Sequence, residues 1–168
     1  MVWRIFRPAW QREIELLVTK ELEYLGPEFG FGKPKYKREW WQTTIHFLDP
    51  SLAIEVDLDW YYPGVFFLVV ALEEGRLPES GYVSKGRTCR IHLMQLLKDK
   101  KWIEPDEFNV FTEKRGKRIK KATYPKKPED FKEDIRRYSA LLKDKLPLIL
   151  ANRDTLFDEA DKRRADLG

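Results

Sequence analysis

Glu55, Asp57 and Asp59 are three carboxylates at alternate positions of one segment, and this spacing is the strongest chemical pattern in the chain. Apolar residues alternate with them from Leu52 to Trp60. In a β-strand, alternate side chains point to the same face, about 7 Å apart. The three carboxylates would therefore share one face of a sheet. Because neighbouring like charges repel, such a row favours binding of a cation or of a basic protein partner.

Two carboxylates so placed, Asp57 and Asp59, can also hold Mg²⁺ or Mn²⁺ for phosphoryl chemistry. The run from Val56 to Asp59 resembles the metal-binding aspartate strand of archaeo-eukaryotic primases and related polymerases. In that family a Ser/Gly segment ending in His follows, and residues 84–92 (Ser-Lys-Gly-Arg-Thr-Cys-Arg-Ile-His) fit this pattern. The resemblance implies metal-dependent phosphoryl chemistry. The intervening segment is short and no third aspartate strand is evident, so this stays an alternative.

A second pattern is a basic segment, residues 114–127, that contains eight cations and no acid. Without these eight, the chain has 24 cations against 28 acids, so the rest of it is mildly acidic despite the net charge of +4. On a hairpin, the segment could contact nucleic-acid phosphates in a weak, non-specific and salt-dependent manner, or be a solvated tip. Only Tyr124 lies nearby to stack on bases. The cations are Lys114, Arg115, Lys117, Arg118, Lys120, Lys121, Lys126 and Lys127.

Several classes of site are excluded or disfavoured by the composition. The single cysteine, Cys89, allows no internal disulfide, and with only two histidines it cannot build a cysteine-based zinc site. Cys89 is a nucleophile candidate beside His46 or His92, but a buried helix position is the favoured interpretation. Phosphate-loop, dinucleotide-binding, nucleophile-elbow and His-Glu-x-x-His motifs are missing. We therefore predict no cofactor and favour a non-enzymatic protein.

Length and composition predict one domain spanning residues 1–168. Abundant Glu, Lys and Arg beside scarce Gln, Asn, Cys and Met are typical of proteins from hot environments. The first residues have no apolar stretch resembling a secretory signal, and the longest apolar run, residues 65–72, is too short to cross a bilayer. These features predict a cytoplasmic protein that is not inserted in a membrane.

The spacing of apolar residues predicts the elements that would position these side chains. An amphipathic helix is expected over residues 10–25, followed by a loop over residues 30–37. Three antiparallel strands are expected over residues 41–47, 52–60 and 65–72, the last two joined by a turn centred on Pro63 and Gly64. Together they form an antiparallel β-meander.

The register of the meander follows from which residues must face the core. If Ile45 and Phe47 share the core face with Ile54 and Val56, His46 lies opposite Glu55, and the pairs Thr44–Asp57 and Gln42–Asp59 follow. Across the Pro-Gly turn, the predicted pairs are Asp59–Leu68, Asp57–Val70 and Tyr61–Phe66. The acidic row would then lie beside an apolar row that must be covered by a helix, another subunit or a partner. That row is Phe66, Leu68, Val70 and Leu72.

The remainder of the chain predicts a helix over residues 88–98 that buries Cys89, and then a hairpin of residues 108–113 and 118–124. Pro128 is expected to open a helix and Pro147 to start another. The expected order is α-β-β-β-α-β-β-α-α. Helices and antiparallel strands segregated in this way predict an α+β fold, with the meander of about three strands and the later hairpin packed against helices.

We combine these patterns into two hypotheses. The first is an intracellular protein-interaction module that binds an unknown protein partner through an acidic and aromatic sheet face. It resembles bacterial immunity proteins that neutralise toxins, in general type only. The second is a nucleic-acid-binding protein that uses residues 114–127, with the metal chemistry at Asp57 and Asp59 as an addition. The sheet-face residues are Glu55, Asp57, Asp59, His46, Phe66 and Leu68.

Overall fold

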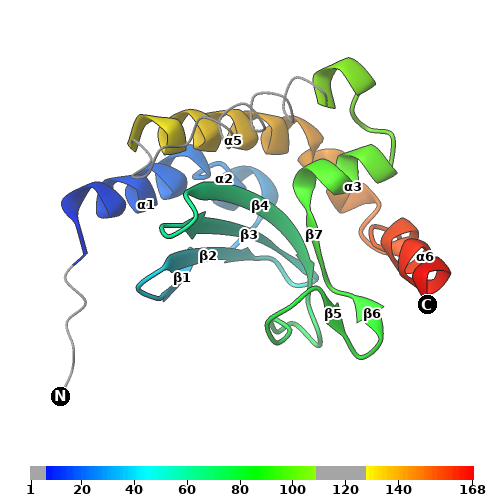
Figure 1. Ribbon diagram of the computed structural model, residues 1–168. Coiled ribbons are helices and arrows are strands. Elements are labelled where there is room, and N and C mark those ends of the chain that lie inside the picture. Colours follow the sequence, from blue (N-terminus) through cyan, green and yellow to red (C-terminus); the bar gives the residue numbers. More distant parts are fainter. Residues whose placement is uncertain (1–6, 109–127) are drawn as a thin grey trace.

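The computed structural model describes residues 7–108 and 128–168 (Figure 1). The fold is α+β, with an antiparallel meander packed against helices, as predicted. The main sheet has the order β1-β2-β3-β4-β7. Its strands are β1 (Lys35–Arg38), β2 (Gln42–Leu48), β3 (Leu52–Asp59), β4 (Gly64–Ala71) and β7 (Arg90–His92). A small second sheet consists of β5 (Val83–Ser84) and β6 (Arg87–Thr88).

The main helices lie on one face of the sheet (Figure 1). Helix α1 packs against α5, and α5 also contacts β4. The core between them contains Ile14 and Val18 of α1, Ile54 and Val56 of β3, and Phe131 of α5, all buried. Ile54 and Val56 therefore face the core as predicted. The helices are α1 (Ala9–Glu21), α2 (Leu25–Phe29), α3 (Leu93–Asp99), α5 (Pro128–Ala151) and α6 (Asp158–Leu167).

The pairing of β2 with β3 confirms the predicted register. His46 lies opposite Glu55, and the pairs Thr44–Asp57 and Gln42–Asp59 follow in order. The Asp49 carboxylate helps to set the connecting turn, because its Oδ1 accepts hydrogen bonds from the backbone N–H groups of Ser51 and Leu52, both at 2.7 Å. Side chains that cap a turn in this way fix where the following strand begins.

The predicted pairing of β3 with β4 was wrong by four residues. Asp57 lies opposite Phe66 rather than Val70, Glu55 lies opposite Leu68, and Asp59 lies opposite Gly64. The strand ends early because Asp59 Oδ1 accepts hydrogen bonds from the backbone N–H groups of Tyr61 and Tyr62, at 2.9 and 2.7 Å. Tyr61 thus belongs to the turn and does not pair with Phe66. Since the shift is an even number of residues, every side chain stays on its predicted face.

Three further predictions of element boundaries were wrong. The predicted loop over residues 30–37 contains most of β1, a polar edge strand without an apolar period. The helix expected from residue 88 begins at Leu93, because residues 90–92 pair with β4 as strand β7. Cys89 is buried as predicted, but before β7 rather than on a helix. Pro147 lies inside α5 and starts no new helix, since Leu146 and Ile149 around it are packed into the core.

The structure does not describe the hairpin expected over residues 108–124, apart from Phe108, which ends the first described range. All eight cations of the basic segment also lie outside the described residues. None of the helices in the two described ranges is long and apolar enough to span a membrane.

Candidate functional site: an acidic groove on the sheet

A groove of about 570 Å³ lies on the sheet face opposite the core. Its floor comes from four strands: Thr44 and His46 of β2, Glu55 and Asp57 of β3, Leu68 of β4 and Arg90 of β7. Its walls come from the β1–β2 end of the sheet, where Trp41 lies, and from residues 77–82, which we call the strap. The main helices pack on the other face of the sheet and do not cover the groove (Figure 1).

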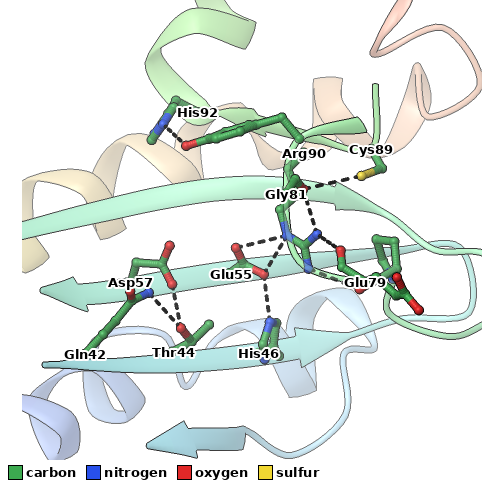
Figure 2. Close-up of polar contacts among 12 residues, drawn as sticks. Gln42, Thr44, His46, Glu55, Asp57, Glu79, Gly81, Cys89, Arg90 and His92 are labelled. Atoms are coloured by element: carbon green, nitrogen blue, oxygen red, sulfur yellow. Dashed lines mark hydrogen bonds and ion pairs between the residues drawn. The ribbon is translucent and has the colours of Figure 1, made fainter. Parts of the chain in front are cut away.

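Glu55 is a buried carboxylate whose charge is balanced within the fold. It is 4% exposed, and His46 Nε2 donates a hydrogen bond to its Oε2 at 2.7 Å. Arg90 Nε donates to the same oxygen at 3.1 Å (Figure 2). Burial alone would raise the pKa of Glu55, but the His46 hydrogen bond and the Arg90 charge outweigh it, so the pKa is lowered. Glu55 is therefore ionised at neutral pH and held by its own partners.

Arg90 also fixes the strap. Its Nη1 donates to the backbone carbonyls of Glu79 and Gly81 at 2.6 and 2.9 Å, while its Nε holds Glu55. One guanidinium thus joins the floor of the groove to its wall (Figure 2). Because a planar guanidinium presents several donors in fixed directions, a lysine could not make the same set of contacts.

Asp57, the second carboxylate on the floor of the groove, has different partners from Glu55. Its Oδ1 accepts a hydrogen bond from the Thr44 hydroxyl at 2.8 Å, and Gln42 Nε2 donates to the same hydroxyl at 3.0 Å. In the described part of the chain, no lysine or arginine forms an ion pair with Asp57. Burial and the neighbouring charge of Glu55 raise its pKa to about 6. Asp57 is therefore mostly ionised at neutral pH and gains a proton as the pH falls through about 6.

The remaining residues of the predicted binding face do not contribute an open side chain to the groove in the way that Asp57 does. Asp59 caps the turn after β3 and does not line the groove. Leu68 lines the groove but is only 2% exposed, and Val70 is fully buried. Phe66 packs with the His92 ring at a centroid distance of 5.7 Å. Two of the four residues of the predicted apolar row, Leu68 and Val70, are thus buried within the chain itself.

Sequence reasoning missed two side chains that shape this site. Arg90 lay in a segment predicted to be helical, and Tyr82 lay between the predicted strand over residues 65–72 and that helix. The Tyr82 hydroxyl is 2.9 Å from His92 Nε2. Burial, followed by the charges of Asp57 and Glu55, raises the pKa of Tyr82, which remains a neutral hydrogen-bonding group on the wall. Neither residue had a local signal that would have placed it beside Glu55.

The described residues contain no group of three or more His, Cys, Asp or Glu side chains arranged to hold a metal ion. The two-carboxylate metal site predicted at Asp57 and Asp59 stays a prediction, although one oxygen of Asp59 is already used by the turn.

Comparison of the chain with protein-family models, with curated proteins and with solved structures finds no match.

Proposed function

We propose that this protein is a non-enzymatic binding module whose groove accepts a lysine or arginine side chain from a partner protein, with Asp57 as the main contact. The observation that carries the proposal is the contrast between two neighbouring carboxylates. Glu55 is balanced by Arg90 and His46, whereas Asp57 has only neutral hydrogen-bond donors among the described residues. A cation supplied from outside would complete the pairing that the fold leaves open.

The energetics favour an external cation. A partly buried carboxylate next to another negative charge is unfavourable in its ionised form, which is why the pKa of Asp57 is raised to about 6. A guanidinium or ammonium group bound beside Asp57 would favour the ionised form. By linkage, the affinity for such a group should rise as the pH rises through about 6.

The walls of the groove supply the other contacts that protein interfaces use. Trp41 is 37% exposed and Tyr82 is 52% exposed, on opposite walls. Exposed Trp and Tyr beside a charged residue are the side chains enriched among the strongest contributors to protein–protein binding. Because the Arg90 contacts fix the strap, little ordering is needed when a partner enters.

The proposal is tested by selecting peptides against the groove. A randomised peptide library is selected for binding to the wild-type protein and counter-selected against Asp57→Lys. We expect the enriched sequences to share a lysine or arginine, to bind Asp57→Lys at least ten-fold more weakly, and to bind Asp154→Asn as they bind the wild type. Asp154 is an exposed carboxylate outside the groove, so this variant is a matched control.

Enrichment of acidic or purely apolar peptides, or equal binding to wild type and Asp57→Lys, would contradict the proposal. Far-ultraviolet circular dichroism of each variant separates loss of binding from loss of folding.

A second candidate function, weak binding of nucleic acid, is supported by the eight cations without an acid in residues 114–127. It uses a different part of the chain, so the two functions are tested separately.

A further inference from the structure

A second surface of unusual composition lies at one end of the sheet, outside the groove. It consists of Trp40, Tyr61 and Tyr62, which are 67%, 55% and 68% exposed. Trp40 belongs to the turn between β1 and β2, and the two tyrosines belong to the turn between β3 and β4. These turns lie at the same end of the meander, and the backbone N–H of Trp60 donates to the carbonyl of Trp41 at 2.8 Å. We call the three rings the aromatic corner.

The rings of the aromatic corner pack against one another at nearly right angles. The centroids of Trp40 and Tyr61 are 5.9 Å apart with an interplanar angle of 82°. Those of Tyr61 and Tyr62 are 4.7 Å apart at 86°. This edge-to-face packing fixes the ring orientations while leaving much of each ring exposed to solvent. Three large exposed aromatic rings held together indicate a binding surface rather than scattered surface residues.

The charges around the corner favour a cation as its ligand. Asp59 lies two residues before Tyr61, and its Oδ1 accepts hydrogen bonds from the backbone N–H groups of Tyr61 and Tyr62. Glu39 precedes Trp40 in the chain and forms an exposed ion pair with Lys37 at 3.9 Å. An aromatic face attracts a cation, and a nearby carboxylate adds to that attraction. Within residues 7–108 and 128–168, no lysine or arginine lies over any of these three rings, although Arg38 does lie over Tyr36.

We propose that the aromatic corner is a receptor for a second cationic side chain, preferably an arginine, of the same partner that occupies the groove. Trp41 lines the groove and adjoins the corner through its chain neighbour Trp40, so a partner seated in the groove would reach the corner by extending past Trp41. That the cation comes from the partner in the groove rests on the proposed function. That the corner binds a cation rests only on its three aromatic rings and the nearby carboxylate. Arginine is preferred because its planar guanidinium stacks on aromatic faces.

The test compares N-acetyl-arginine amide with N-acetyl-citrulline amide, which has nearly the same shape and no charge. Binding is followed by NMR through the Trp40 indole N–H and the ring protons of Tyr61 and Tyr62. We expect the arginine compound to bind roughly two- to five-fold more tightly, the ratio that corresponds to a cation–π contribution of about 0.5–1 kcal/mol at an exposed site. Trp40→Ala should abolish the response, whereas Leu16→Ala, which removes an equally exposed apolar side chain on α1, away from the groove and the corner, should retain it.

Equal binding of the two compounds would show an uncharged apolar contact and would overturn the inference, as would a response confined to groove residues. The peptides selected on the groove separate this inference from the proposed function. If they bind Trp40→Ala as well as wild type but still require Asp57, the inference fails and the proposed function stands. If they require Trp40 but bind Asp57→Lys normally, the groove proposal fails and the corner stands.

Discussion

Replacing Asp57 by Asn should stabilise the protein at neutral and alkaline pH. The wild-type carboxyl has a pKa of about 6 when folded, against 3.8 for a free aspartate side chain. Each pKa unit corresponds to about 1.4 kcal/mol, so the charged form of Asp57 is disfavoured by at most about 3 kcal/mol, and by less where solvent screens it. Asn is neutral at every pH and can keep the hydrogen bond with Thr44, so it avoids this penalty.

The sign of the pH dependence follows from proton linkage. Because folding raises the pKa of Asp57, the folded state holds the proton more tightly than the unfolded state does. The resulting stabilisation is fully present below the unfolded pKa, and it is lost as the pH rises through about 6. The variant should therefore differ little from wild type near pH 4 and be more stable by up to about 3 kcal/mol near pH 8.

The assay is urea denaturation of wild type, Asp57→Asn and Asp154→Asn across this pH range. The exposed control at Asp154 should not reproduce the pH-dependent gain. A variant that is less stable than wild type near pH 8, or a difference that does not change with pH, would refute the reasoning about Asp57. A gain in stability together with a loss of peptide binding is the result expected of a residue retained for function.

Three other outcomes are expected. Arg90→Ala should destabilise the fold by about 3–5 kcal/mol in urea denaturation, because it leaves buried Glu55 with His46 alone; a loss below about 1 kcal/mol would show that Arg90 does not balance Glu55. Binding to DNA should be weak, fall steeply with salt in mobility-shift assays, and disappear when four cations of the basic segment are changed to Gln; no shift at low salt would remove nucleic acid from consideration. Millimolar Mg²⁺ or Mn²⁺ should leave the Tm unchanged in thermal scans, and a rise that Asp57→Asn abolishes would favour the phosphoryl-transfer alternative. The four cations are Lys117, Arg118, Lys120 and Lys121.

The sequence predicted the sheet well where the core pattern and a single turn signal agreed. Ile45 and Phe47 had to share a face with Ile54 and Val56, and the turn that Asp49 helps to set agrees with this requirement, so the β2–β3 register was correct. The next turn contained two competing signals, Pro63-Gly64 and the Asp59 side chain. The hydrogen bonds of Asp59 decided the outcome, and these depend on a backbone geometry that composition does not reveal.

The site was predictable only in part for a similar reason. The shared face of His46, Glu55 and Asp57 followed from alternation along the strands. Which carboxylate is balanced within the fold depends on Arg90, 35 residues away from Glu55 along the chain. Arg90 lies on a strand of three residues, too short to have a recognisable period, so its neighbours indicated a helix instead.

The most direct test of the proposed function is the pKa of Asp57 itself, measured by NMR titration of its side-chain carboxyl carbon. We expect a pKa of about 6 in the free protein and a clear decrease when a groove-selected basic peptide is bound. The peptide's cation should lower the pKa because it stabilises the ionised carboxylate, and the carboxyl carbon of Asp154 should not respond. A pKa that is the same with and without saturating peptide would contradict the claim that the partner's cation pairs with Asp57.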